Sequence, residues 1–186
     1  MSKPASQPTW AAVKARLATF DRTGLDSLVK DLYAAHKDNQ TFLHTRLGLG
    51  EDVLKPYRET IERWISPDVY RNQRPSVATA KQAIFDYKKA CGDPAGTAEL
   101  MVFYCELAAD FACSFGEDET YLGALLNMFE RALATIDTLP SDAHKPLLLR
   151  LAKVRDLCGN LGYFLVDHMS DMLAEWEELD ETEPET

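Results

Sequence analysis

The 186-residue sequence predicts an all-α protein, with eight or nine helices in antiparallel hairpins that form a compact bundle or a short stack of helical hairpins. Apolar residues recur at spacings of three and four along most of the chain, which is the period of an amphipathic helix. No segment shows the sustained period-two alternation of β-branched residues that is typical of a strand. Short turns separate the predicted helices, and short connections favour antiparallel neighbours.

Four helices are expected before residue 66, and each carries one apolar stripe. They cover about 9–20, 25–36, 38–47 and 51–65. The first stripe, which we expect to point inward, consists of Trp10, Val13, Leu17 and Phe20. The second consists of Leu25, Leu28, Val29, Leu32 and Tyr33. A short turn from Asp68 to about Asn72 follows the fourth helix.

The chain is organised around a predicted helical hairpin from Ser76 to Gly116. Ser76 is a good N-cap, because its hydroxyl can accept a hydrogen bond from an N–H of the first turn. At the break between the two helices, Gly92 can adopt the left-handed conformation that ends a helix, and Asp93-Pro94 suits the start of the next. From Ala95 to Phe115 the apolar residues cover most of the circumference, so this segment is predicted to be the central core helix.

The run AKQAIFDYKKACGDPAGTAELMVFYCE, with LVKDLYAAHKDNQTFLHTRL upstream, resembles a family of short, uncharacterised bacterial all-helical proteins, a domain of unknown function. The resemblance covers roughly residues 25 to 175. It implies a helical fold and a bacterial source. The family has no assigned activity, so the resemblance implies no chemistry.

Three further helices are expected after Gly116. The first runs from about residue 119 to 138, and the second carries the stripe of Leu147, Leu151 and Val154. The third runs from about Leu161 to Leu179. The last helix is expected to bury Leu165, either His168 or Met169, Met172, Leu173 and Trp176. Residues 9–179 are predicted to form one domain, between a disordered tail at 1–8 and an acidic disordered tail at 180–186.

Composition indicates a globular protein rather than a disordered one, because 46% of the residues are hydrophobic. No apolar run follows the N-terminal lysine, and no stretch approaches the length of a membrane span, so we expect neither a signal peptide nor membrane association. A cytoplasmic location is therefore expected. The four cysteines, with no Cys-x-x-Cys pair among them, are expected to be buried thiols: Cys91, Cys105, Cys113 and Cys158.

The net charge of −10 hides a strong polarity along the chain. Residues 1–89 contain 15 Lys and Arg against 10 Asp and Glu, whereas residues 90–186 contain 5 against 20. Residues 171–186 alone contribute eight acids and no base. A distribution of this kind can steer a charged partner, although it says nothing of the fold.

The sequence contains no complete catalytic or metal-binding set. Glu99, Glu106 and Asp110 share one helix face, but the Glu-x-x-His pairs that usually complete a carboxylate metal site are absent, so a solvated acidic face is the simpler interpretation. His168 lies between Asp167 and Asp171 without an identifiable nucleophile. Neither a cofactor nor a metal ion is expected.

A basic band is the remaining candidate for a binding surface. It contains Arg71, Arg74, Lys81, Lys88 and Lys89, with Tyr87 nearby. The open N–H groups after Asp93-Pro94 add a second possibility, an anion site beside the lysines. The alternative interpretation is a tight turn that needs no ligand. A sequence pI of 4.8 argues against binding of duplex nucleic acid.

The function that best accounts for these features is that of a non-enzymatic protein-interaction or scaffold module that binds another protein or itself. The apolar helical core and the charge polarity support this hypothesis. One alternative is a small enzyme whose site is assembled from residues distant in sequence. Another is a regulator that contacts nucleic acid through residues 71–89.

Overall fold

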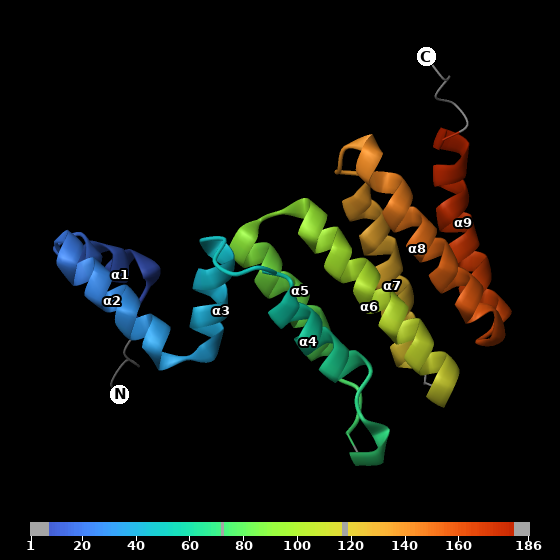
Figure 1. Ribbon diagram of the computed structural model, residues 1–186, viewed down its shortest axis with the longest axis horizontal. Helices are drawn as coiled ribbons and strands as arrows, with labels where there is room; N and C mark the ends of the chain where they lie inside the picture. The colour runs from blue at the N-terminus through green and yellow to red at the C-terminus, as the bar shows by residue number, and fades with distance from the viewer. Residues whose placement is uncertain (1–7, 72, 117–118, 181–186) are drawn as a thin grey trace, which may run out of the picture.

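The computed structural model describes residues 8–71, 73–116 and 119–180 (Figure 1). Within these ranges it contains nine α-helices and no strand, which confirms the predicted all-α fold. The helices are α1 (Trp10–Leu17), α2 (Arg22–Ala35), α3 (Lys37–Arg46), α4 (Lys55–Ile65), α5 (Val77–Cys91), α6 (Pro94–Phe115), α7 (Glu119–Ile136), α8 (His144–Leu157) and α9 (Tyr163–Asp180). Three short 3-10 helices connect them: η1 (Val69–Arg71), η2 (Ser141–Ala143) and η3 (Cys158–Asn160). The predicted tails fall almost entirely on residues outside the described ranges.

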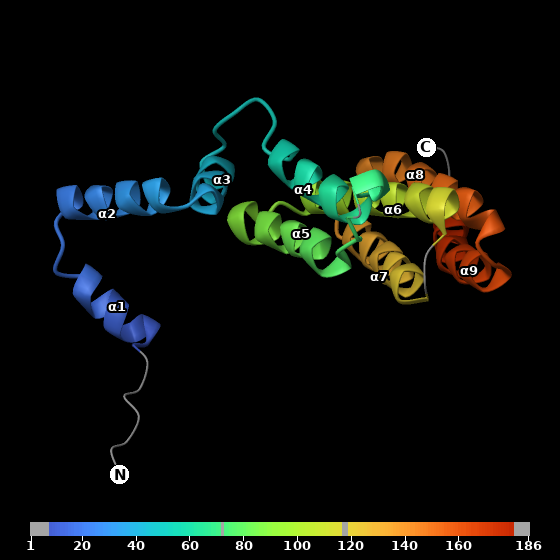
Figure 2. The same ribbon diagram turned by 90° about the horizontal axis from the view of Figure 1, so that it is seen from below.

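Helices α4 to α9 form two layers around α6. Figure 2 shows α4, α6 and α8 in one layer and α5, α7 and α9 in the other. The helix pairs α4–α5, α6–α7 and α8–α9 each join the two layers, and α6 contacts α4, α5, α7 and α8. Twelve of the 22 residues of α6 are buried, so the segment expected to be the central core helix has that position.

The turn between α5 and α6 follows the predicted capping chemistry. Gly92 has a φ of +71° and ends α5 in the left-handed conformation, which a residue without a Cβ adopts without strain. The Asp93 carboxylate then accepts hydrogen bonds from the backbone N–H groups of Ala95 at 3.0 Å and Gly96 at 2.9 Å. Pro94 occupies the first turn of α6, where its missing N–H costs nothing. The Asp93 side chain therefore satisfies the first N–H groups of α6 at the turn of the hairpin.

The first two helices do not join this core, and the prediction that the first apolar stripe points inward is wrong. No residue of α1 or α2 is buried, and Trp10 is 69% exposed. Val13 and Phe20 are exposed as well. In both views α1 and α2 extend away from α4–α9, while α3 packs against α5 (Figures 1 and 2). A period of 3.6 residues identifies the apolar face of a helix without identifying what covers it, which is why the prediction failed.

A buried hydrogen bond fixes α3 to the core. The hydroxyls of Thr45 and Tyr57 lie 3.0 Å apart, and the Tyr57 ring packs edge-on against Tyr87 with centroids 5.3 Å apart. Burial raises the pKa of Tyr57, so the phenol stays protonated at neutral pH. Thr45 and Thr97 are the polar residues buried in the described chain. The hydrogen bond to Tyr57 satisfies the buried hydroxyl of Thr45.

Replacing Thr45 with valine should therefore lower the free energy of unfolding by about 1–2 kcal/mol, because the Tyr57 hydroxyl would stay buried without its partner. Urea unfolding followed by far-UV circular dichroism measures the change. The double variant Thr45→Val/Tyr57→Phe, which removes both hydroxyls, should recover most of the loss. A double variant as unstable as the sum of the two single variants would contradict this explanation.

The cysteine prediction is correct for two of the four thiols. Cys105 and Cys158 are buried, and burial raises the pKa of both. Cys91 and Cys113 are exposed, although the residues directly before them, Ala90 and Ala112, are buried at the same helix ends.

On α9, Met169 is the buried member of the expected pair, and His168 is exposed. None of the described helices combines the length and the apolarity that crossing a membrane requires.

Candidate functional site

A groove runs between α5 and α7, with α6 as its floor. The two flanking helices lie in the same layer (Figure 2), and each contacts α6. Two pockets of about 300 Å³ each open along the groove. The first extends from Val77 and Lys81 on α5 across Tyr104 to the first half of α7, and the second from Phe85 and Lys88 across Met101 to the end of α7.

One residue pair spans the groove where the two pockets meet. Arg131 on α7 lines both pockets, and its guanidinium lies 5.3 Å from the ring centroid of Phe85 on the opposite wall. The lining residues of α7 recur every three or four positions from Thr120 to Thr138. At a rise of 1.5 Å per residue this corresponds to a groove about 25 Å long.

Among the described residues, the charged groups that line the two pockets are all cations. They are Lys81, Lys88 and Arg131. None of the three forms an ion pair with another described residue. The described walls of both pockets also contain no Asp, Glu, His or Cys. The groove is therefore a local excess of positive charge on a protein whose net charge is −10.

The first pocket offers an additional hydrogen-bond donor. Tyr104 is 1% exposed, lines the pocket, and makes no hydrogen bond to another residue of the described chain. Burial raises the pKa of Tyr104, so its phenol remains a donor at neutral pH. Asn127 uses its Nδ2 to donate to the carbonyl of Gly123 at 3.2 Å, which leaves its side-chain carbonyl for other contacts. Together with Lys81 and Arg131, the Tyr104 hydroxyl suits a carboxylate.

The second pocket is more apolar in character. Its Thr135 and Thr138 hydroxyls donate to backbone carbonyls at 2.8 and 2.7 Å, so their hydrogen-bonding capacity is used within α7 and its C-terminal turn. Ile84 and Met101 contribute apolar surface, and Lys88 supplies the charge at this end. This pocket suits an aliphatic side chain beside an acidic group.

The structure places the five bases of the predicted band on different surfaces. Lys81 and Lys88 are seven residues apart on α5, which puts them on the same helix face, and both line the groove. Lys89 is exposed and lies outside both pocket linings. Arg71 and Arg74 lie in the connection before α5, where Arg71 pairs with Asp68 at 3.2 Å.

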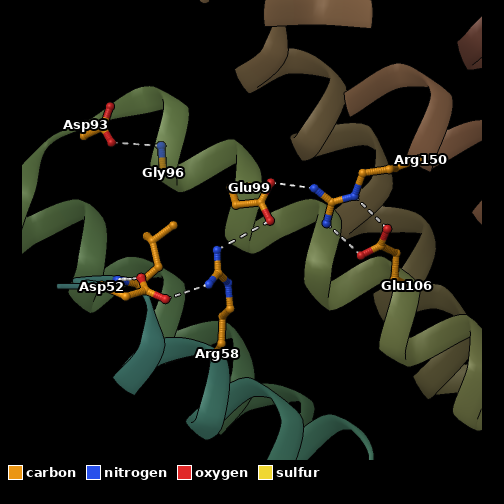
Figure 3. Close-up of polar contacts among 8 residues, drawn as sticks. Asp52, Arg58, Asp93, Gly96, Glu99, Glu106 and Arg150 are labelled. Carbon is orange, nitrogen blue, oxygen red and sulfur yellow. Dashed lines mark hydrogen bonds and ion pairs between the residues drawn. The ribbon is translucent and has the colours of Figure 1, made fainter. Parts of the chain in front are cut away.

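Tyr87 and Asp93 hold the turn between α5 and α6. The buried Tyr87 donates its hydroxyl hydrogen to Asp93 Oδ2 at 3.0 Å. The same carboxylate caps α6 by accepting hydrogen bonds from two backbone N–H groups, and Figure 3 shows the one from Gly96. The N–H groups that we considered as an anion site are therefore occupied by the protein's own carboxylate. Their arrangement corresponds to the tight turn that was the alternative interpretation.

Glu99 and Glu106 are neither metal ligands nor a solvated face, because Arg150 of α8 binds both (Figure 3). Its guanidinium donates two hydrogen bonds of 2.7 Å to Glu106 and another to Glu99. Hydrogen bonding to Glu106 raises the pKa of Arg150 further above its ordinary value. The network continues from Glu99 to Arg58 at 3.7 Å and from Arg58 to Asp52 at 3.0 Å, so it joins the helices α4, α6 and α8.

The third acid of the predicted set, Asp110, is exposed and lies outside this network. The first two acids alone therefore have a structural role. Over the described ranges, no group of three or more His, Cys, Asp or Glu side chains is arranged to hold a metal ion.

Sequence reasoning missed Arg131, which forms the centre of the groove. It is the first base after Lys89, and it lies on a helix whose groove side also presents Gly123 and Ala124. An isolated base beside small residues was the only available signal. Pairing it with Lys81 and Lys88 required knowledge of which helices flank α6.

No family model, no curated protein and no solved structure matches this chain. The interpretation of the groove rests on its own chemistry.

Proposed function

We propose that this chain is a protein-interaction module that holds an acidic amphipathic helix of a partner protein in the groove between α5 and α7. One observation carries the proposal: Lys81, Lys88 and Arg131 line two adjoining pockets whose described walls contain no acid. Cations without ion pairs beside apolar surface attract a segment that brings carboxylates and aliphatic side chains together.

The dimensions of the groove favour a helix as its occupant. A groove about 25 Å long matches a helix of about 16 residues. Gly123, Ala124 and Ala134 on the α7 wall are small, so a helix backbone can approach closely. Met101 and Met128 offer adaptable apolar contacts to the side chains of that helix.

The two other functional hypotheses have less support from the groove. General acid–base catalysis uses a group that changes protonation near neutral pH, and the described walls contain no His, Asp, Glu or Cys. Nucleic-acid binding is favoured by a broad basic face, whereas Arg71 and Arg74 lie apart from the groove and the sequence pI is 4.8. An acidic protein segment suits a narrow cationic groove on an acidic protein.

Charge reversal in the groove tests the proposal. A fluorescein-labelled amphipathic peptide built from leucine and glutamate serves as the probe, and its fluorescence anisotropy reports binding. The variant Lys81→Glu/Arg131→Glu is expected to weaken binding by roughly tenfold or more, because two attractive charges become repulsive. A matched peptide with lysine in place of glutamate is expected not to bind.

The matched control is Lys145→Glu/Lys153→Glu, which makes the same change in net charge at two exposed positions on α8. This variant should bind the leucine–glutamate peptide as wild type does. Equal affinity of the groove variant and wild type would rule the groove out as the binding site.

A further inference from the structure

Helices α1 and α2, which we call the arm, expose an apolar surface that nothing in the bundle covers. The large apolar side chains of the arm region that are exposed are Trp10, Val13, Phe20, Val29, Leu32 and Tyr33. Both helices nevertheless begin at well-formed caps. Thr9 accepts a hydrogen bond from the N–H of Ala12 at 3.4 Å, and Asp21 accepts one from Gly24 at 2.7 Å.

Helices of this length normally depend on packing. The arm helices have 8 and 14 residues, and isolated helices shorter than about 12–15 residues are marginal in water. The apolar stripe of an amphipathic helix is stabilised by the surface that buries it. The arm therefore has the features of a docking element whose counterpart is not its own bundle.

A surface with complementary features lies at the other end of the molecule. Leu157 at the end of α8 and Phe164 at the start of α9 are 43% and 70% exposed. Cys113 of α6 donates to the backbone carbonyl of Leu157 at 3.3 Å, which brings the end of α6 to the same place. Asp110 is exposed three residues before Cys113 on α6 and interacts electrostatically with its thiol, and Asp167 is exposed three residues after Phe164 on α9. We call these four residues, Leu157, Phe164, Asp110 and Asp167, the distal patch.

We propose that the arm of one molecule docks on the distal patch of a second copy. Helix α1 carries Lys14 and Arg16 and no acid, beside Trp10 and Val13, so it presents apolar and basic groups together. The distal patch presents apolar and acidic groups together. Contact between the two surfaces pairs opposite charges and buries apolar area on both sides.

Two observations identify a second copy as the occupant. The arm and the distal patch lie at opposite ends of one molecule (Figure 1), so a chain does not reach its own patch. Residues 1–89, which contain the arm, have an excess of five positive charges, whereas residues 90–186 have an excess of fifteen negative charges. The basic half of one copy is therefore attracted to the acidic half of the other. Reciprocal docking of two arms makes two identical contacts in a closed dimer. The cationic groove between α5 and α7, by contrast, repels the bases of α1.

The full-length chain tests this proposal through its molar mass, measured by size-exclusion chromatography with light scattering. Wild type is expected to have twice the 20.9 kDa mass of one chain at low salt. Trp10→Glu/Val13→Glu should reduce the mass to that of one chain. Because the arm contributes no residue to the buried core, the variant should keep the helical content of the bundle, which far-UV circular dichroism measures. Tyr70→Glu, at a side chain 91% exposed outside both surfaces, is the matched control and should remain dimeric.

Charge exchange identifies the two surfaces that meet. Lys14→Glu/Arg16→Glu and Asp110→Lys/Asp167→Lys should each give a monomer, and the variant with all four substitutions should regain the dimer. A wild-type monomer, or a dimer that persists in Trp10→Glu/Val13→Glu, would overturn the proposal. The arm variants should bind the leucine–glutamate peptide normally and the groove variants should remain dimeric, so failure of one proposal is distinguishable from failure of the other.

Discussion

Replacing Arg150 with methionine is expected to lower the free energy of unfolding by about 3 kcal/mol, because Glu99 and Glu106 would keep their places without the cation that binds them. Arg150 and Glu99 are 28% and 27% exposed at their side chains, and Glu106 is 35% exposed. Partial exposure places the expected effect at the lower end of the range for buried ion pairs. Methionine retains the aliphatic volume, so the change isolates the charge.

Urea unfolding of wild type and variant measures this effect. Arg155→Met is the matched control, because Arg155 pairs with the exposed Asp156 next to it in sequence and its loss should cost no more than about 0.5 kcal/mol. Adding Glu99→Gln and Glu106→Gln to Arg150→Met should recover part of the stability, since the unpaired charges are then removed. Equal stability of the two single variants would show that the network contributes nothing.

Replacing Gly96 with alanine is expected to cost about 3 kcal/mol, because the position has no room for a methyl group. A Cβ at this position would overlap the Tyr87 hydroxyl and would lie 2.7 Å from Tyr87 Cζ and 2.8 Å from Asp93 Oδ2. Relief of this overlap requires Tyr87 to leave its buried site or the Asp93 cap to open. The substitution therefore strains the packing of α5 against α6 and the capping of α6.

Thermal and urea unfolding measure this loss, and α7 offers a matched control. Gly123 is also helical, but a Cβ there would meet nothing within 4 Å, so Gly123→Ala should raise stability by up to about 1 kcal/mol through helix propensity. Tyr87→Phe removes the overlapping hydroxyl and should partly rescue Gly96→Ala. A Gly96→Ala variant as stable as wild type would contradict the close packing described here.

The packing at Gly96 also accounts for the residue types found between positions 87 and 96. Gly92 ends α5 and Asp93 caps α6. Gly96 leaves room for the Tyr87 hydroxyl, which donates a hydrogen bond to Asp93. Its lysines are not part of this turn. Lys88 faces the groove, and Lys89 is exposed.

Local features of the structure could be predicted from the sequence because they depend on neighbours in the chain. Ser76, Gly92 and Asp93-Pro94 end or begin helices where expected, since capping is decided within a few residues. The apolar circumference of residues 95–115 likewise predicted the central helix. Capping residue types were sufficient for the first feature, and apolar periodicity for the second.

Features that depend on distant partners could not be predicted in this way. Arg150 lies 51 residues from Glu99 and 44 from Glu106, so nothing in the spacing of the acids indicated a cation between them. Arg131 joins Lys81 and Lys88 only because α5 and α7 flank the same helix. The exposure of Trp10 could not be predicted either, because the apolar spacing of α1 resembles that of a core helix. Whether α1 packs on the bundle depends on the direction in which α2 places it.

The central claim of this account is that the groove between α5 and α7 binds an acidic helix. Titration of the leucine–glutamate peptide into the isotope-labelled protein, followed by methyl NMR, tests it most directly. The methyl resonances of Ile84, Met101 and Met128, which line the groove, should shift, and those of Leu149 and Leu157 on α8 should not. Shifts confined to α8 and α9, or no shifts at all, would contradict the claim.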